Sequence, residues 1–187
     1  EALSRINKGL TGMVGAFSRL PVLGTALAGA FSGAAITAGI KSVVDGADEL
    51  QKASQKYGIA VEQLSALKYA GALSDVSLEA IGNGLKKLSV NMLDAAAGSG
   101  EAQLAFKALG ISVSEAGGGL KSSEQVFSEI ADKFASMEDG AGKTALAVKL
   151  FGRAGAELIP LLNQGAKGLA DMKKEAEALG AIVGGDL

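Results

Sequence analysis

The chain contains no histidine, no cysteine and no tryptophan, and only two of its 187 residues are proline. Without His and Cys there are no thiol nucleophiles, no disulfides and no zinc sites of the usual kinds, and no imidazole can act as a general base near pH 7. Long runs of Val, Ile, Thr and aromatic residues are also missing, which disfavours an extended sheet. With neither His nor Cys present, the sequence predicts no cofactor and no metal site.

Small and aliphatic residues dominate what remains. Hydrophobic residues make up 48% of the chain but aromatic residues only 4%, and there are 27 glycines. Because Ala and Leu are strong helix formers, this composition predicts an all-α fold. The formal net charge is −2 with Lys and Glu interspersed, which argues against a face that binds duplex nucleic acid. We therefore expect no sequence-specific nucleic-acid binding.

Residues 20–40, LPVLGTALAGAFSGAAITAGI, carry no charge between Arg19 and Lys41. As a helix this stretch would rise roughly 31 Å, close to the thickness of the hydrocarbon core of a bilayer. Two interpretations stay open: the stretch spans a membrane at some stage, or it is a buried helix packed against copies of itself. In either case its packing residues would be the larger apolar side chains and the Gly-x-x-x-Gly pair, namely Leu20, Leu23, Leu27, Gly29, Phe31, Gly33, Ile36 and Ile40.

The chain is accordingly predicted to have two parts. Residues 1–44 form an apolar, Gly/Ala-rich, membrane-like helical segment, and residues 45–187 form a module of several short amphipathic helices separated by glycine-rich breaks. Since the first residue is Glu1 rather than Met, we expect the chain to be a piece of a longer protein.

The best-defined helix of the module follows Ser77, a favourable N-cap residue. Its apolar residues alternate between spacings of three and four, which gives a seam of under three heptads. Such a seam is long enough to pack against a partner helix and too short for an autonomous coiled coil. The seam residues are Leu78, Ile81, Leu85, Leu88 and Met92.

Residues 111–121 are predicted to form a small loop or a tiny two-stranded β-ribbon, because Ile111 and Val113 alternate with polar residues before a glycine-rich turn. Ser122 and Gln125 then form a capping box for the next helix, which ends near Met137.

Beyond a hinge, the sequence predicts helices over residues 144–151, 156–163 and 166–179. A break separates the first two at residues 152–155, and Pro160 is expected either to kink or to restart the second. The last helix should turn Leu169, Met172, Ala176 and Leu179 inward.

The hexapeptide DGAGKT, residues 139–144, resembles the end of a phosphate-binding loop. Gly142, Lys143 and Thr144 fit the second half of that motif, but Met137 stands where its first glycine should be. The motif also requires a preceding strand, whereas an amphipathic helix is predicted here. We therefore interpret the hexapeptide as a turn between two helices and expect no nucleotide binding.

Three separated segments point to a known family. They are YGIAVEQLSALK at residues 57–68, ALGISVSE at 108–115 and EIADKFASMEDGAGKTALAVKLFGRAGAELIPLLNQG at 129–165. In this order they resemble the tape measure proteins of long-tailed bacteriophages and related prophages, over about residues 45–183. One departure is Ala60, where relatives often have a helix-capping Ser.

The resemblance implies a structural virion protein and no enzymatic activity. Tape measure proteins fill the lumen of the tail tube in several copies, set tail length during assembly, and leave ahead of the DNA to assist its passage through the host envelope. The implied partners are further copies of the chain, the tail tube protein, tail tip or baseplate proteins and tail assembly chaperones, with the host inner membrane as a further candidate. The implied location is the tail tube lumen, and after ejection the host membrane or periplasm.

Two alternatives belong to other classes of protein. A membrane-active pore-forming or channel protein would act through residues 20–40. An enzyme that cleaves peptidoglycan would need a positioned glutamate or a metal site, yet Glu101, Glu124 and Glu157 occupy ordinary helical surface positions with no partner group.

Overall fold

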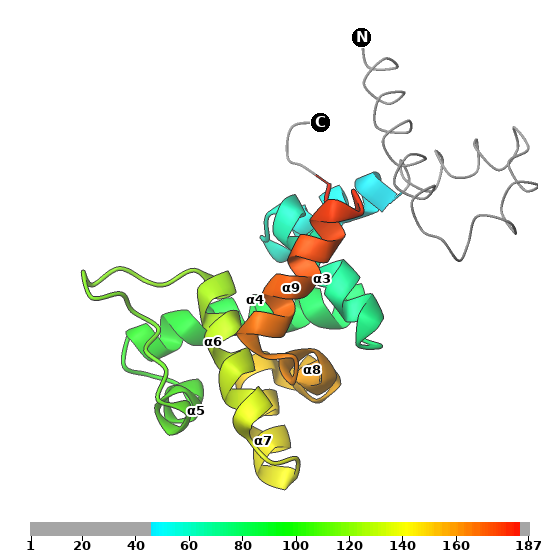
Figure 1. The fold of residues 1–187 in the computed structure, drawn as a ribbon. Helices are drawn as coiled ribbons and strands as arrows, with labels where there is room; N and C mark the ends of the chain where they lie inside the picture. The colour runs from blue at the N-terminus through cyan, green and yellow to red at the C-terminus, as the bar shows by residue number, and fades with distance from the viewer. Residues whose placement is uncertain (1–45, 184–187) are drawn as a thin grey trace, which may run out of the picture. The chain divides into compact units, whose positions relative to one another are not determined.

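The computed structural model describes residues 46–183, and this part of the chain is helical with no β-strand (Figure 1). The only strand-like pairing among these residues is an isolated antiparallel bridge between Ser114 and Leu120. The all-α prediction is confirmed, and so is the small loop near 111–121. The helices are residues 46–57, α3 (Val61–Leu73), α4 (Leu78–Ala96), α5 (Ala102–Leu109), α6 (Ser123–Ser136), α7 (Ala141–Phe151), the 3₁₀ helix η1 (Gly152–Ala154), α8 (Gly155–Leu162) and α9 (Gly165–Ala178).

The predicted apolar segment, residues 20–40, lies outside the described residues. From Leu50 onward the chain forms one compact unit, which is described by itself below. The predicted boundary between residues 44 and 45 stays a prediction.

Serine side chains cap the N-terminal ends of two of the central helices. The Ser77 hydroxyl accepts a hydrogen bond from the Ala80 amide at 3.1 Å. Ser122 accepts from the Gln125 amide at 3.1 Å, and the Gln125 side chain accepts from the Ser122 amide at 3.0 Å. Both predicted caps are confirmed. Helix α3 has Ala60 at its N-cap and no side-chain cap, as the presence of Ala rather than Ser implies.

Several predicted helix boundaries between residues 140 and 163 were wrong. Helix α7 begins at Ala141 rather than at Thr144, because the Gly140 carbonyl accepts from both the amide and the hydroxyl of Thr144 and so closes the first turn. Where a break was predicted, η1 joins α7 to α8 by a 3₁₀ turn. Helix α8 is continuous across Pro160, so the chain does not restart there.

The prediction that Leu179 points inward was also wrong. Helix α9 ends at Ala178, and Leu179 at its C-cap is 51% exposed. Of the other predicted inward residues, Ala176 is buried, and Leu169 and Met172 are partly buried against the core.

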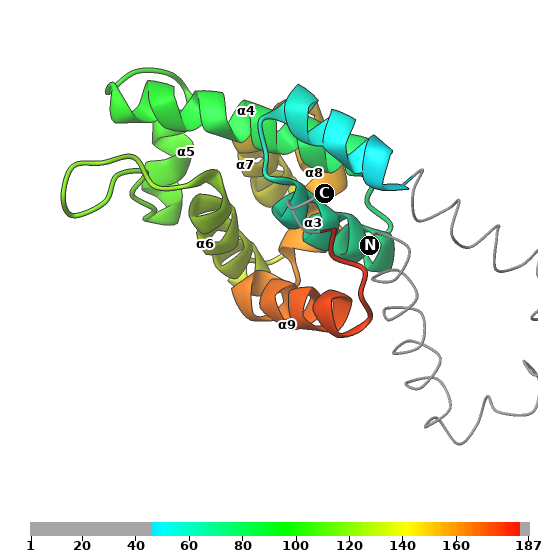
Figure 2. The same cartoon turned by 90° about the horizontal axis from the view of Figure 1, so that it is seen from above.

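Helix α4 organises the unit, since it packs against α3, α5, α6, α7 and α8. Figure 2 shows α4 along one edge of the unit and α9 along the opposite edge, with α3 and α6 between them. Helix α9 packs mainly on α3 and α6. The apolar core lies between the helices at these two edges. It contains residues from every helix from α3 to α8.

Candidate functional site

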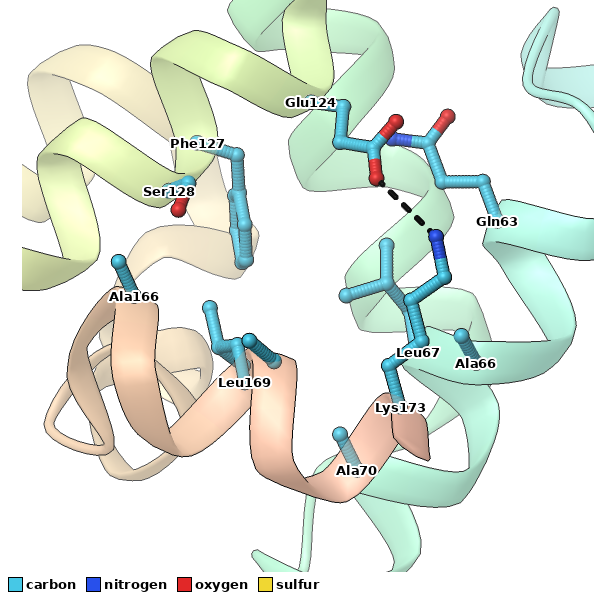
Figure 3. Close-up of a pocket in the computed structure, with 11 residues that line it drawn as sticks. Gln63, Ala66, Leu67, Ala70, Glu124, Phe127, Ser128, Ala166, Leu169 and Lys173 are labelled. Atoms are coloured by element: carbon cyan, nitrogen blue, oxygen red, sulfur yellow. Dashed lines mark ion pairs between the residues drawn. The ribbon is translucent and has the colours of Figure 1, made fainter. Parts of the chain in front are cut away.

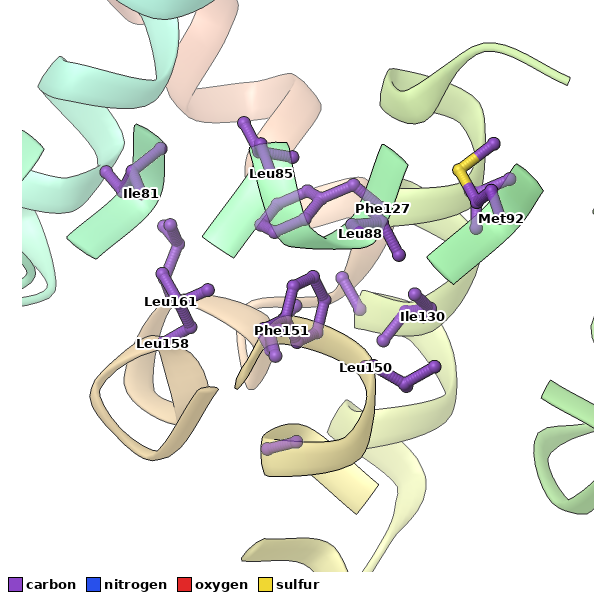
Figure 4. Close-up of a cluster of buried hydrophobic side chains, with 14 of the residues drawn as sticks. Ile81, Leu85, Leu88, Met92, Phe127, Ile130, Leu150, Phe151, Leu158 and Leu161 are labelled. Carbon is purple, nitrogen blue, oxygen red and sulfur yellow. The ribbon is translucent and has the colours of Figure 1, made fainter. Parts of the chain in front are cut away.

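The predicted seam on α4 lies at the centre of this core (Figure 4). Ile81, Leu85, Leu88 and Met92 are fully buried, and Leu78 is partly buried. Figure 4 shows the four fully buried side chains facing apolar residues of α6, α7 and α8, among them Phe127, Leu150 and Leu158. The seam packs within the unit, so its buried residues offer no free surface to another chain.

Two phenylalanines join the helices opposite the seam. The rings of Phe127 on α6 and Phe151 on α7 meet edge to face, with centroids 5.8 Å apart and an interplanar angle of 76°. This is a favoured arrangement for aromatic pairs, and it ties α6 to the end of α7 beneath α4.

A polar residue beside the seam completes the contact between α4 and α7. Asn91 is 5% exposed, and its side-chain amide donates to the carbonyls of Lys149 and Leu150, each at 2.9 Å. Carbonyls in the last turn of a helix have no partner within the helix. Asn91 therefore caps the C-terminal end of α7 from a neighbouring helix. The sequence reasoning missed this residue, because nothing local marks a cap that acts across 58 residues.

Two glycines on α4 allow close contact with other segments. A Cβ atom at Gly82 would collide with the ring of Tyr57, and one at Gly84 would collide with Leu158 of α8. The signal available in the sequence was two glycines inside a strongly periodic helix, where glycine costs about 1 kcal/mol relative to alanine.

A groove of about 260 Å³ lies where α3, α6 and α9 meet (Figure 3). Phe127 and Leu67 stand on opposite sides of it, and alanines from α3 and α9 leave its walls shallow. At its rim the Lys173 ammonium lies 3.8 Å from a Glu124 carboxylate oxygen, and both side chains are about half exposed. Such an exposed pair contributes little to stability. The groove is lined by Gln63, Ala66, Leu67, Ala70, Glu124, Phe127, Ser128, Ala166, Leu169, Ala170 and Lys173.

The hexapeptide at residues 139–144 follows α6 rather than a strand. The side chain of Lys143 is only 3% exposed, and its ammonium donates to the Met137 carbonyl at 3.1 Å and to Asp139 Oδ1 at 2.8 Å. Since Met137 is the C-cap of α6, the positive charge lies where a helix end favours it. Lys143 thus fastens the end of α6 to the start of α7, and its ammonium is already engaged by protein acceptors.

The Asp139–Lys143 contact also changes an acid–base equilibrium. The hydrogen bond from Lys143 and then its charge lower the pKa of the Asp139 carboxyl below its ordinary value, and the nearby Asn163 side chain acts in the same direction.

The three glutamates considered for catalysis are exposed and do not share a site. Glu101 precedes α5, Glu124 lies on the rim of the groove in Figure 3, and Glu157 lines a separate hollow of about 550 Å³ together with Glu79 and Arg153. In residues 46–183 no group of three or more acidic side chains could hold a metal ion.

Across residues 46–183, no helix is both long enough and apolar enough to cross a membrane. The membrane interpretation of residues 20–40 concerns a stretch outside this range and stays a prediction.

Comparison with known proteins identifies the family. Residues 22–152 match the family model described as phage-related minor tail protein. Among curated proteins and among solved structures, no match was found. The family match includes most of the apolar stretch and the helical unit as far as the end of α7. Since it covers more than half of the chain, the chain belongs to the family of phage-related minor tail proteins.

Proposed function

We propose that this minor tail protein is part of a tape measure protein, which fills the tail tube lumen, sets tail length during assembly and leaves with the DNA at infection. The family match carries the proposal, because it extends from residue 22, within the apolar stretch, to residue 152, in the helical unit. The three motifs of the tape measure family, from residue 57 to residue 165, agree with it. As a phage tail protein, the chain acts in the virion tail among other tail components.

Helical structure suits a ruler because chain length converts linearly into distance, at about 1.5 Å per residue. Residues 50–183 as one continuous helix would span about 200 Å. The same residues folded as a compact unit have an expected radius of gyration of only about 14 Å. The contribution of this unit to tail length therefore depends on whether it is folded or opened inside the tube.

In-frame deletions in the full-length gene test the ruler role. Deleting residues 50–183 should shorten the tail by about 200 Å for an opened segment and by far less for a folded one. A deletion of equal length elsewhere in the ruler region is the matched control, and tail length is measured by electron microscopy. Tails of unchanged length for both deletions would exclude a ruler role.

The proposed partners follow from this position. Inside the tube the chain would contact other copies of itself and the tail tube protein, and at the ends of the tail it would contact tip or baseplate proteins. Tail assembly chaperones would hold its apolar segments before the tube closes around them. Co-purification of each partner with the full-length protein from infected cells tests these contacts.

A second candidate function is a membrane channel formed by residues 20–40, and its support is the uncharged length of that stretch. The two functions are compatible, since a ruler that leaves the tail could then enter the host inner membrane. Leakage of dye from liposomes by the purified chain, abolished by Gly29→Glu or Gly33→Glu, would support a channel. Leakage that is absent, or unchanged by both substitutions, would refute it.

A further inference from the structure

The outer face of α4, opposite the seam, carries exposed apolar residues. Val90 is 45% exposed and Leu93 is 60% exposed. Lys86, Asp94 and Ala97 are exposed beside them. At 100° per residue these five positions fall within an arc of about 100°, which makes them one face of the helix. Figure 2 shows that α4 runs along an edge of the unit, so this face points away from the helices that cover the seam.

Charges on this face are arranged in an ordered way around Val90. Lys86 lies four residues before Val90 and Asp94 lies four residues after it. In the part of the chain that the structure describes, neither side chain takes part in an ion pair. Around Val90 the face therefore offers a positive group, an apolar centre and a negative group, at intervals of about one helical turn. The exposed Glu79 lies on the same arc at the start of the helix, about three turns from Val90.

We propose that a second copy of this chain docks on this face, with the two α4 helices antiparallel and a two-fold axis beside Val90. In that arrangement Val90 meets its own counterpart and the two Leu93 side chains flank it. Each Lys86 lies opposite Asp94 of the second copy, which gives two identical ion pairs. A parallel arrangement would instead place like charges side by side.

Self-complementarity is the reason for choosing a second copy over another tail protein. A surface whose charge changes sign across its own centre matches itself after a two-fold rotation, which is the defining property of an isologous interface. This inference rests on the proposed function for its context, because several copies held in one tail raise the effective concentration of a small interface.

Disulfide trapping tests the geometry, because the chain has no cysteine of its own. Val90→Cys places a thiol beside the two-fold axis, where it can meet its counterpart. Val148→Cys on α7 is the matched control, since Val148 is 44% exposed and Val90 45%. With the full 187-residue chain under mild oxidation, we expect the Val90→Cys variant to form a covalent dimer at least about tenfold faster than the Val148→Cys variant. Equal rates would overturn the proposal.

Charge exchange in the Val90→Cys background tests the pairing. Lys86→Glu and Asp94→Lys each create two like-charge contacts, and each should slow the formation of the covalent dimer by about tenfold. The variant that carries Lys86→Glu and Asp94→Lys together recreates both pairs with reversed sign and should restore the original rate. Circular dichroism confirms that each variant is folded. Single exchanges that leave the trapping rate unchanged, or a double exchange as slow as the single ones, would refute the antiparallel pairing.

Site-specific trapping is preferred to a measurement of mass, since residues 20–40 could associate independently of α4. The outcome is also separable from the ruler role. If trapping of the Val90→Cys variant fails while in-frame deletions still shorten tails, the interface is wrong and the proposed function stands. If deletions leave tails unchanged while trapping succeeds, the interface stands and the proposed ruler function is wrong.

Discussion

Asn91 is the polar residue on which the packing of α4 against α7 most depends. Its two hydrogen bonds satisfy the Lys149 and Leu150 carbonyls, and the Asn91 side chain is itself buried. Asn91→Ala leaves both carbonyls without this donor, so we expect the free energy of unfolding to fall by about 1–3 kcal/mol. Urea denaturation followed by circular dichroism measures the change.

Asn83 provides the control on the same helix. Its side chain is exposed, so Asn83→Ala should change the free energy of unfolding by no more than about 0.5 kcal/mol. If the two alanine variants were equally stable, the cap on α7 would have no energetic importance.

Two glycines in the α7–α8 region should respond to alanine in opposite directions. A Cβ atom at Gly155 would collide with the Ala147 carbonyl and with the Val148 amide, which are backbone atoms that cannot move independently. Gly155→Ala should therefore lower the free energy of unfolding by about 1–3 kcal/mol. Gly142 lies within α7 with open space around it, so Gly142→Ala should raise stability by about 0.5–1 kcal/mol. Thermal melts of both variants measure the two changes in stability. Two changes of the same sign would contradict the close packing at Gly155 or the open space at Gly142.

Among individual residues, the sequence correctly predicted those whose roles depend on spacing along the chain. The seam of α4 and the caps at Ser77 and Ser122 were readable because each involves neighbours within a few turns. Asn91 was not readable, since an Asn beside an apolar stripe is usually a surface residue and its partners lie on another helix. Lys143 was expected at the start of a helix in a turn, and its burial against the end of α6 became visible only in three dimensions.

At the scale of elements, the turn between α6 and α7 should depend on pH. Lys143 lowers the pKa of Asp139, so the folded state binds that proton less tightly than the unfolded chain does. The stabilisation is therefore fully present above about pH 4, the ordinary carboxyl pKa, and is lost as pH falls through the lower folded-state value. Asp139→Asn should lower the melting temperature at pH 7, and the difference from the parent should vanish in strong acid.

A matched substitution separates this effect from a general loss of negative charge. Glu115 is exposed in the loop before α6, and its side chain forms no ion pair within residues 46–183. Glu115→Gln should leave the melting temperature nearly unchanged at pH 7. A pH-independent difference for Asp139→Asn would mean that the ion pair is not its cause.

Contacts between distant elements explain why helix boundaries were harder to predict than helices. The Asp132 carboxylate on α6 accepts from the Ala166 amide at 2.6 Å and so caps the start of α9 across 34 residues. The local sequence there, Asn163-Gln164-Gly165, contains no strong N-cap at the observed position. Periodicity identifies the face of a helix, whereas the point at which a helix begins can be set by a side chain from elsewhere in the fold.

At the scale of the whole molecule, one continuous core predicts one cooperative unfolding transition. Because α4 contacts α3, α5, α6, α7 and α8, and α9 joins α3 to α6, separating any of these contacts within residues 50–183 exposes apolar surface of the shared core. A fragment of residues 50–187 should therefore melt in a single step with an enthalpy of about 90 kcal/mol, equal by calorimetry and by van 't Hoff analysis. Two resolved transitions would show that α3 and α9 form a separate folding unit.

This cooperativity constrains the proposed ruler. Domains of this kind are typically stabilised by about 5–15 kcal/mol, so contacts with the tube and with other copies must exceed that amount to open the unit. The substitution Leu88→Asp would place a carboxylate in the core. It would lower the free energy of unfolding of the unit, since an unpaired carboxylate cannot be buried without a large cost. If the unit is opened in mature tails, full-length protein carrying Leu88→Asp should still give tails of normal length. If the unit stays folded in the tail, the same substitution should give tails of altered length or no tails, as counted by electron microscopy.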